Sequence, residues 1–261
     1  MAPLTRVAVL NDIHANLQAL DAVLDEVRRP SVEAIVLGGD VLPGPMPIDT
    51  LDCLRDLDVP VRAVYGNGEL ALLAQLDASD PAAVTYWGTT GGGPLPDKYK
   101  EWMRWTARQL RPDDTRVLRT WPLTLRLEIA GIGAVLFCHG TPTSEIDAFT
   151  RTTPEDVLRP VFDGVDASVV VCGHTHMQFD RMIGSTRVVN AGSVGCPFAR
   201  TGADWLLLDG AVQLRHTDYD IEAAAAQMRA GAFPGADEFA NNVVNPPSEE
   251  AMLQAFSRAS F

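Results

Sequence analysis

The stretch from Val169 to His176 reads VVVCGHTH, and it indicates both a buried strand and a candidate site. Three valines and a cysteine form a short apolar run that is typical of a strand inside a sheet, and Gly173 ends it. His174 and His176 then leave the end of this strand as a pair. Two histidines with this spacing can bind one metal ion from different sides, although a histidine beside a strand can equally be a hydrogen-bonded core residue. The rest of the chain has to decide between these interpretations.

The composition fits one folded domain, or one domain with a small appendage. The chain has 261 residues, of which 46% are hydrophobic and 21% are charged, so it can bury a full core. Its 34 acidic and 21 basic residues give a formal net charge of -13, which repels a polyanion such as duplex DNA. An extended nucleic-acid groove is therefore not expected. If the substrate carries phosphate, divalent cations rather than Lys and Arg would have to attract it.

The cysteines and the apolar runs predict a cytoplasmic protein without a membrane span. The four cysteines have no CxxC spacing, and two of them lie in apolar runs where a buried thiol is ordinary. No run of about 18 apolar residues occurs, and the N-terminus enters a strand pattern without the apolar region of a signal peptide. Association into a homo-oligomer remains open.

The N-terminal part of the chain repeats a strand-helix unit three times. The expected strands are 6–10, 34–37 and 61–65, and the expected helices are 17–29, 48–57 and 70–76, the first of them stopped by Pro30. Three consecutive units of this kind favour a parallel sheet with right-handed crossovers. Open sheets of this type place their sites at the carboxyl ends of the strands.

The later part of the chain favours hairpins. The expected strands are 123–129, 134–138, 169–172, 181–183, 186–189, 205–208 and 211–215, with a loop at 89–96 and helices at 97–110 and 154–162. The helix at 97–110 carries an aromatic face, including Tyr99 and Trp102, that is expected to pack into the core. Parallel units followed by hairpins favour an α/β fold of four layers, α-β-β-α, in which two mixed sheets pack face to face with helices outside.

The chain is expected to divide into a main domain and a tail. Residues 1–216 would form the main domain, and residues 70–115 within it would form a helical insert near the site. Residues 217–261 would form a C-terminal helical tail packed on this domain. Within the tail, 221–229 and 248–257 are expected to be helices and 235–247 a loop.

Seven polar residues fall at the ends of five expected strands. They are Asp12, His14, Asp40, Asn67, His139, His174 and His176. The set offers carboxylate, amide and imidazole groups without a cysteine, which favours manganese, iron or zinc over a thiolate zinc site. Four of the five histidines belong to it. The fifth, His216, lies beyond the strand pattern and is expected to be a surface or core residue.

Five short motifs occur at these strand ends. They are D-x-H at Asp12 and His14, G-D at Gly39 and Asp40, G-N-x-[DE] at 66–69, H-G at His139 and Gly140, and G-H-x-H at 173–176. In this order they resemble the motifs of the calcineurin-like metallophosphoesterases. The segments DIHANLQAL, GDVLPGPMP, CHGTP and VVNAGSVG are similar to those of the small bacterial phosphodiesterase branch of that family. The resemblance extends from about residue 6 to residue 208.

The resemblance implies a binuclear metal centre. Asp12, His14 and His176 would hold one ion, Asn67, His139 and His174 the other, and Asp40 would bridge them. Manganese or iron is expected first, with zinc as a further candidate. Two ions about 3.5 to 4 Å apart share a hydroxide, lower its pKa and polarise phosphoryl oxygens. The residues expected to be catalytic are accordingly Asp12, Asp40, Asn67 and His139.

Further groups are candidates for contacts to the substrate phosphate. They are Asn16, Asn67 and the backbone amides of Gly68 and Gly140. For Asn16, capping of the first helix is an equal alternative. Many phosphomonoesterases that this chain resembles have a histidine at the position of Gly68, which would protonate the leaving oxygen. Its absence is expected to widen the pocket, and Glu69, if it is exposed, is ionised near neutrality and a poor replacement.

These features favour a hydrolase that cleaves phosphodiesters or nucleotides with a metal-bridging hydroxide. The protein-phosphatase signature G-D-x-x-D-R-G is absent because Val41 to Gly44 follow Asp40, which disfavours a phosphoprotein phosphatase. The alternatives are a phosphomonoesterase of small metabolites, a non-catalytic scaffold with this fold, and a protein with a closed structural metal site. A scaffold would be expected to lack some of the ligands, and none of the seven is missing.

Overall fold

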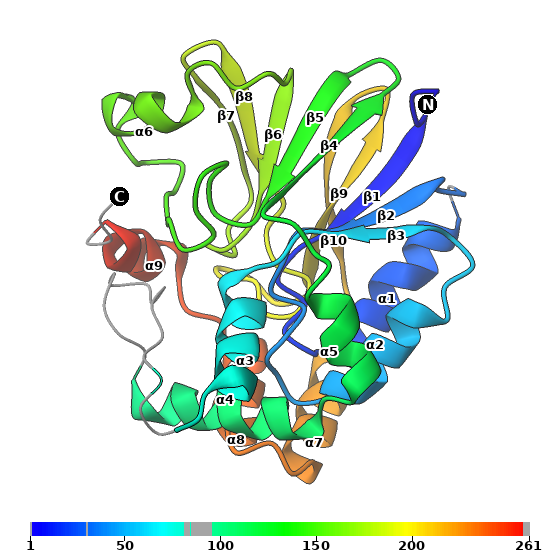
Figure 1. Ribbon diagram of the computed structural model, residues 1–261, viewed down its shortest axis with the longest axis vertical. Helices are drawn as coiled ribbons and strands as arrows, with labels where there is room; N and C mark the ends of the chain where they lie inside the picture. The colour runs from blue at the N-terminus through cyan, green and yellow to red at the C-terminus, as the bar shows by residue number, and fades with distance from the viewer. Residues whose placement is uncertain (1, 30, 81–83, 85–95, 258–261) are drawn as a thin grey trace.

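Two mixed sheets and their outer helices form the protein (Figure 1). The computed structural model describes residues 2–29, 31–80, 84 and 96–257. The strands in these residues are β1 (Arg6–Leu10), β2 (Ala34–Leu37), β3 (Val61–Ala63), β4 (Thr124–Ile129), β5 (Gly133–Cys138), β6 (Val169–Cys172), β7 (Phe179–Ile183), β8 (Thr186–Asn190), β9 (Ala203–Asp209) and β10 (Val212–Thr217). The helices are α1 (Leu17–Arg28), α2 (Pro47–Arg55), α3 (Asn67–Asp77), α4 (Asp97–Gln109), α5 (Pro112–Leu118), α6 (Glu155–Phe162), α7 (Ile221–Ala230), α8 (Ala236–Val244) and α9 (Glu249–Phe256).

The first sheet has the strand order β10-β9-β1-β2-β3. Strands β1, β2 and β3 are parallel, as the strand-helix repeats predict, with Val7 opposite Ala34 and Ile35 opposite Val61. Strand β9 is antiparallel to both β1 and β10. Strands β1 and β2 lie inside the sheet and are covered on both faces, which explains their unbroken apolar sequences.

The second sheet has the order β4-β5-β6-β8-β7. Strands β5, β6 and β8 are parallel, and the edge strands β4 and β7 run antiparallel to their neighbours. Both sheets are therefore mixed, as predicted. In each sheet the parallel strands end at a common edge.

The core between the two sheets is made by alternate residues of their strands. Val7 and Val9 of β1, Phe137 of β5 and Val171 of β6 are buried there together. Because side chains alternate along a strand, Leu10 faces the opposite side and packs with the outer helices. This central layer confirms the face-to-face packing of the predicted four-layer α-β-β-α sandwich.

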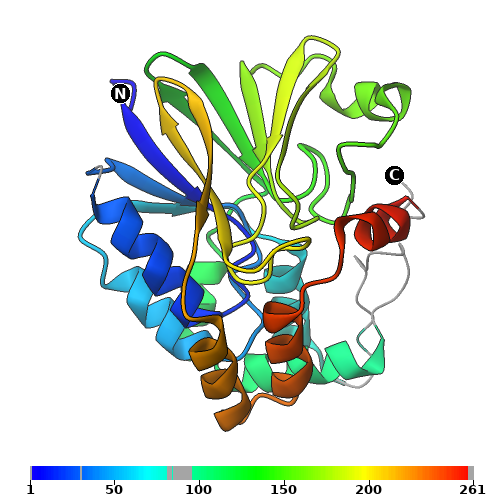
Figure 2. The ribbon, with the colours of Figure 1, turned by 180° about the vertical axis from the view of Figure 1, so that it is seen from behind.

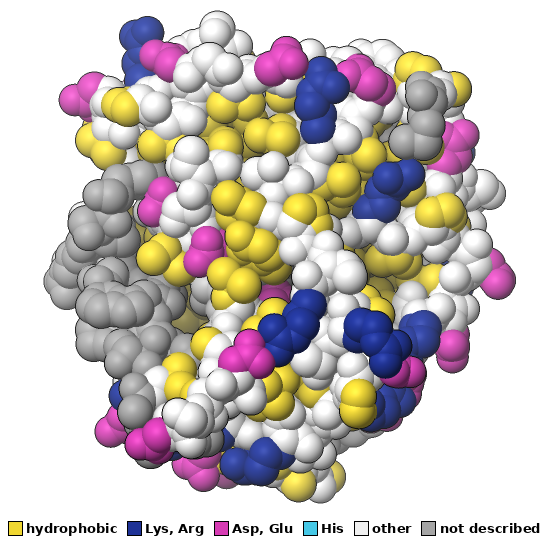
Figure 3. Space-filling model, in the orientation of Figure 1, with side chains coloured by type: hydrophobic (Ala, Val, Ile, Leu, Met, Phe, Trp, Pro, Cys, Tyr) yellow, Lys and Arg dark blue, Asp and Glu magenta, His cyan; other side chains and the backbone are white. Residues whose placement is uncertain are grey.

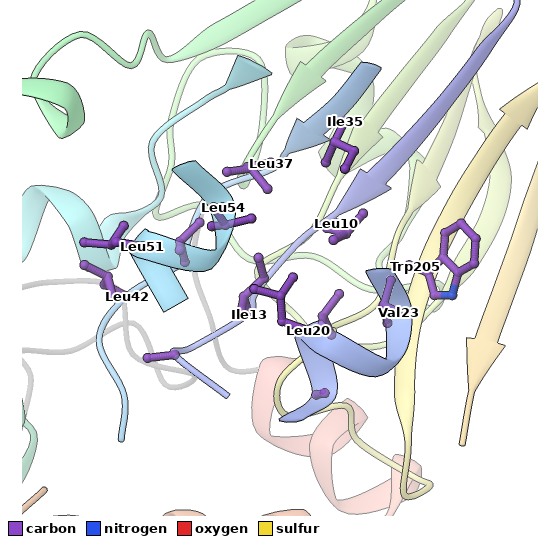
Figure 4. Packing of buried hydrophobic residues seen from close by; sticks show 14 of the residues in the cluster. Leu10, Ile13, Leu20, Val23, Ile35, Leu37, Leu42, Leu51, Leu54 and Trp205 are labelled. Atoms are coloured by element: carbon purple, nitrogen blue, oxygen red, sulfur yellow. The ribbon is translucent and has the colours of Figure 1, made fainter. Parts of the chain in front are cut away.

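Helices α1 and α2 cover the outer face of the first sheet. In α1, Leu20, Val23 and Leu24 recur at helical spacing and are buried in the same cluster as Leu10 and Leu37. Figure 4 shows the labelled side chains of α1 and α2 directed toward those of β1 and β2. Burying each such side chain contributes about 1.5–3 kcal/mol. Helix α6 covers the second sheet in the same way.

Two helices differ from the sequence prediction. Helix α8 occupies part of the expected loop at 235–247, because Phe239, Ala240 and Val243 form a short apolar face that is buried in a cluster with α7. The Asn241-Asn242 pair interrupts this face in the sequence. Helix α5 follows α4 and was not indicated by the pattern, since it is short and only Asp114 and Leu118 in it are buried.

Smaller differences concern the ends of elements. Strand β3 ends at Ala63 instead of residue 65, and α3 begins at Asn67 instead of residue 70. The loop expected at 89–96 lies outside the described residues except for Pro96. None of the helices in the described part of the chain is long and apolar enough to cross a membrane.

Candidate metal centre

The structure brings all seven expected ligand residues to one place. Asp12 and His14 follow β1, Asp40 follows β2, Asn67 begins α3, His139 follows β5, and His174 and His176 follow β6. The parallel strands of each sheet end at one edge, and the sheets pack face to face, so these edges meet.

One cluster consists of Asp12, His14 and His176. The Nε2 atoms of His14 and His176 are 3.1 Å apart. Asp12 Oδ1 lies 3.3 Å from His176 Nε2 and 4.0 Å from His14 Nε2. Ligand atoms that each lie about 2.0–2.2 Å from one ion are separated by distances of this order. The three groups therefore suit a single cation.

The second cluster contains Asp40, His139 and His174, with Asn67 beside it. His139 Nε2 lies 3.1 Å from His174 Nδ1 and 3.1 Å from Asn67 Oδ1. Asp40 Oδ1 is 3.6 Å from His139 Nε2, and Asp40 Oδ2 is 3.9 Å from His14 Nε2 in the first cluster. Asp40 thus directs one oxygen toward each cluster, which is the geometry of a bridging carboxylate.

Backbone carbonyl groups orient three of the four histidines. The Nδ1 atoms lie 3.3 Å (His14 to Pro43), 2.9 Å (His139 to Gly38) and 2.8 Å (His176 to Cys196) from carbonyl oxygens. A carbonyl oxygen can only accept, so each Nδ1 carries a proton. In the neutral ring each Nε2 then presents its lone pair to the centre, as a metal ligand does.

The inward-facing atoms fit two divalent cations. Asp12 Oδ2 accepts the backbone N–H of His174 at 2.9 Å, but the buried Asp12 Oδ1 has no hydrogen-bond partner among the described residues. The lone pairs of His14 and His176 face each other at 3.1 Å, which is repulsive unless a cation or a proton lies between them. The oxygen and nitrogen donors, without a thiolate, match ions such as manganese, iron or zinc.

The backbone at the centre is strained in a consistent way. Asp12, His14, Asp40, His174 and His176 all have positive φ, at 52°, 48°, 50°, 65° and 55°. Residues other than glycine rarely adopt this region, and each such conformation costs about 1–3 kcal/mol. Tertiary hydrogen bonds hold the loops in place, among them the one from His14 N–H to the Asp40 carbonyl at 3.0 Å. The fold therefore fixes the ligand positions at a cost in stability.

Burial and neighbouring charges set the protonation of the centre. Burial favours a higher pKa for Asp12, but His176 and then His139 lower it to about 2. Although burial lowers the pKa of His176, Asp12 raises it well above its usual value. Burial, followed by His139, lowers the pKa of His174 to about 4. An ionised Asp12 and a neutral His174 are ready to bind a cation, whereas His176 releases a proton when it does so.

Glu69 is a buried carboxylate that joins two loops, so the case of an exposed Glu69 considered from the sequence does not apply. It is 0% exposed and accepts the backbone N–H groups of Asp40 at 2.9 Å, Leu42 at 3.0 Å and Gly66 at 2.8 Å. Burial and then the charge of Asp40 raise its pKa to about 7. Its spacing from Gly66 matches a capping box, which is the sequence signal that could have identified this role.

The structure shows the surroundings of three groups that are expected to contact the substrate phosphate. Asn16 Oδ1 caps α1, and its Nδ2 donates to the Gly195 carbonyl at 2.7 Å, so the capping alternative describes its contacts. The Gly68 N–H donates to Asp40 Oδ1 at 2.7 Å. Gly140 is buried, and its contact to the substrate phosphate stays a prediction.

Gly68 has no space for a side chain. A Cβ atom at this position would lie 2.1 Å from the Leu42 carbonyl oxygen and 2.9 Å from Asp40 Oδ1. The expectation that the missing histidine widens the pocket is therefore wrong, because backbone and not open pocket lies in that direction. The loop after β2 occupies the space.

A pocket of about 250 Å³ opens onto the two clusters. Five expected ligands form its floor: His14, Asp40, Asn67, His174 and His176. Its sides contain Tyr99, Trp102 and Met103 of α4, Phe239 and Asn242 of α8, Phe256 of α9, and Pro43, Cys196 and Phe198. None of the described residues that line it is Lys or Arg. Figures 1 and 2 show α4, α8 and α9 on the side of the molecule next to the strand ends.

Two expectations from the sequence, on the aromatic face of α4 and on His216, differ from the structure. The aromatic face of α4 is not only a core face: Met103 is in the core, but Tyr99 and Trp102 also line the pocket. His216 lies within β10 instead of beyond the strands, and its Nδ1 is 2.7 Å from Asp204 Oδ1. It takes no part in either cluster, as expected.

A family model for the calcineurin-like phosphoesterase superfamily domain matches residues 5–211. The chain belongs to this superfamily. The predicted family is thereby confirmed, and both clusters lie within the matched residues of a metal-dependent phosphoesterase domain.

Several proteins are similar to most of this chain, either in sequence or in structure. The uncharacterized protein MJ0912 of Methanocaldococcus jannaschii is 24% identical over 250 residues, which cover 87% of this chain and 93% of the relative. The crystal structure of the hypothetical protein PH1004 from Pyrococcus horikoshii aligns with a TM-score of 0.76 at 21% identity. The alignment covers 91% of this chain and 97% of the PH1004 chain. The crystal structure of a metallophosphoesterase from Sphaerobacter thermophilus aligns with a TM-score of 0.69 at 23% identity. That alignment covers 92% of this chain and 98% of the metallophosphoesterase chain.

Proposed function

We propose that the protein is a metal-dependent phosphodiesterase that acts on small diesters or nucleotides. The observation that carries this proposal is the pair of adjacent clusters joined by Asp40, whose oxygens lie 3.6 Å from His139 Nε2 and 3.9 Å from His14 Nε2. Two cations bound there would supply Lewis-acid activation of the phosphoryl group and a nucleophile near neutral pH. Manganese or iron is the proposed native ion, since both suit mixed imidazole and carboxylate ligands.

The protein's own residues hold and orient the reacting groups. Asp12, His14 and His176 would hold one ion, and Asn67, His139 and His174 the other, with Asp40 between them. The carbonyl-bound rings and the fixed loops keep these atoms in position before a substrate arrives. The pocket gives the substrate phosphate access to this arrangement from one side.

The pocket favours substrates whose leaving group needs no proton. Outside the two clusters, Tyr99 and Cys196 are the ionisable side chains among the described lining residues. The Tyr99 hydroxyl donates to Glu238 Oε1 at 3.1 Å, and burial raises the pKa of Tyr99. A positioned general acid contributes about 10² to 10⁴-fold to the expulsion of a basic alkoxide. Aryl esters and phosphoanhydrides should therefore react better than alkyl monoesters.

The charge of the pocket favours diesters over monoesters. A phosphate monoester carries about 1.5 to 2 negative charges at neutral pH, whereas a diester carries one. No Lys or Arg among the described lining residues compensates the extra charge. Figure 3 shows one face of the molecule, where most of the basic side chains lie in the lower half close to acidic ones.

Metal analysis and a set of nitrophenyl substrates test the proposal. The protein should contain about two ions per chain, lose activity on chelation, and regain it better with manganese than with magnesium. It should hydrolyse bis(p-nitrophenyl) phosphate faster than p-nitrophenyl phosphate, and an alkyl monoester slowest. The His174→Ala variant should be inactive, and His216→Ala, which removes a histidine outside the clusters, is the matched control.

Three results would contradict parts of this proposal. Bound metal without hydrolysis of any ester would favour a structural metal or a scaffold. Equal rates on diesters and alkyl monoesters would exclude the diester preference. Full recovery of activity with magnesium alone after chelation would contradict manganese or iron as the native ion.

A further inference from the structure

We infer that the side of the pocket formed by helices binds a nucleobase carried by the substrate. This inference rests on the proposed phosphodiesterase function. The surface consists of Tyr99, Trp102, Phe198, Phe239 and Phe256, and is called the aromatic wall below. It lies on α4, α8, α9 and the segment after β8, and none of its residues belongs to a metal cluster. The wall is therefore free to select the substrate while the clusters act on the phosphate.

The aromatic wall begins directly at a ligand histidine. The ring of Phe198 stacks on His176, with centroids 4.9 Å apart and an interplanar angle of 22°. Phe256 follows with its centroid 6.5 Å from that of Phe198. A planar group one ester bond away from the phosphate would thus meet aromatic rings. Stacking on such rings accepts any base, because every base has a π-face.

The rings on α4 are held in place by their neighbours. Trp102 makes an edge contact with Tyr99 at a centroid distance of 4.7 Å and packs on Phe233 at 5.1 Å. A Cβ at Gly235 would lie 2.1 Å from the indole of Trp102, so this ring rests directly on the glycine backbone. The α4 part of the wall is preorganised, which lowers the entropic cost of binding.

Asn242 gives the pocket a polar group that suits a base edge. It lines the pocket on α8 and is only partly buried. Its side-chain amide makes no hydrogen bond to another described residue, and it offers both donors and an acceptor. A nucleobase edge can pair with such an amide, whereas a simple aryl ring cannot. This difference favours a nucleoside-type arm over a hydrocarbon ring.

The size and charge of the pocket limit the substrate further. Its volume of about 250 Å³ is below the usual range of roughly 300–1,000 Å³ for pockets that enclose a whole drug-sized ligand. One nucleoside-sized arm suits this space better than a longer chain. The lack of Lys and Arg among the described lining residues disfavours polyphosphates and polynucleotides.

Binding of adenosine, which has no phosphate, tests the inference separately from catalysis. Calorimetric titration of the metal-loaded full-length protein should give saturable binding of adenosine and none of ribose. The Trp102→Leu variant should weaken adenosine binding roughly ten-fold, as expected for loss of a stacking ring. Asn242→Ala should weaken it about five-fold through one lost hydrogen bond, and Asn241→Ala on the same helix is the matched control. Metal content should be unchanged in all three variants.

The outcomes separate the inference from the proposed function. If a preparation that hydrolyses no ester still binds adenosine, the nucleobase site on the aromatic wall is supported. The proposed phosphodiesterase function is then contradicted. Equal binding of adenosine and benzyl alcohol, or unchanged adenosine binding in Trp102→Leu and Asn242→Ala, would overturn the nucleobase site. If thermal melts show that Trp102→Leu does not fold, Phe256→Leu replaces it, with the same expected loss.

Discussion

The candidate metal centre and the aromatic wall meet in one pocket but are built differently. The centre comes from the ends of β-strands, and residues such as Asp12 and His139 in it are 0% exposed. The wall comes from α4, α8, α9 and the segment after β8, and Trp102 in it is only partly buried, as is Asn242 beside it. The centre places its ligands on strained, hydrogen-bonded loops, whereas the wall relies on packing of apolar rings.

This difference assigns separate tasks to the two regions. Strand ends in two packed sheets move little, so they suit atoms that must hold ions at fixed distances. Aromatic rings packed on helices present a surface of fixed shape, and they suit the part of a site that distinguishes substrates. Changes in the centre should therefore alter metal content and rate together. Changes in the wall should alter substrate affinity alone.

The largest effect is expected from Asp40→Asn. This change keeps the size of the side chain and an oxygen for the Gly68 N–H but removes the bridging charge. Loss of a residue that merely orients a ligand costs about 10 to 100-fold, so activity should fall by more than about 100-fold. Activity and metal content should be measured together. Undiminished activity of the metal-replete variant would exclude the bridging role.

The next effect is a loss of stability in Glu69→Ala. Three buried backbone N–H groups lose their acceptor, and the free energy of unfolding should fall by at least about 2 kcal/mol. Metal affinity should fall as well, because Glu69 holds the loop that carries Asp40. Urea unfolding measures the first effect and metal titration the second. Glu33→Ala, which removes an exposed glutamate that accepts the backbone N–H of Thr5, is the control.

Metal binding should itself stabilise the protein. At a manganese concentration of about 100 times Kd, the free energy of unfolding should rise by about 2.7 kcal/mol if only the folded state binds. Denaturant unfolding with and without the ion measures this gain. The gain should shrink in Asp40→Asn and persist in Trp102→Leu. If the gain in the free energy of unfolding shrinks equally in both variants, the metal centre and the aromatic wall do not act as separate regions.

A smaller loss is expected from Gly68→Ala. The added methyl group would meet the Leu42 carbonyl, and such overpacking costs about 1–3 kcal/mol. Activity should fall on diesters and monoesters alike, and Gly68→His should not gain activity on alkyl monoesters. Gly231→Ala, where the nearest atom to the new Cβ is 3.2 Å away, is the control. A gain on alkyl monoesters would show that the loop after β2 can move aside.

The smallest effect is expected from Tyr99→Phe. The ring stays in the aromatic wall, and only the hydrogen bond to Glu238 is lost. The free energy of unfolding should change by less than about 1.5 kcal/mol, with metal content and kcat unchanged. Thermal melts and steady-state kinetics measure these quantities. A clear fall in kcat would mean that the hydroxyl acts on the reaction.

The amino-acid sequence alone predicted which residues the structure brings together in the two clusters, because each of them follows a recognisable apolar strand. VVVC before His174 and His176, and RVAVL before Asp12 and His14, place ligands at strand ends by local pattern. Parallel strands in one sheet share an edge, so the convergence of these ends follows from the same pattern. The four-layer arrangement could be predicted for this reason, and the resemblance of the five motifs at the strand ends predicted the family.

Only the tertiary structure determined the surroundings of that centre. The burial of Glu69, the backbone beside Gly68 and the helix at Ala236–Val244 each depend on atoms from another part of the chain. The pocket brings Trp102 and Asn242 together although 140 positions separate them in the sequence. No local periodicity records such a contact, because it depends on how whole elements pack and not on the residues within any one of them.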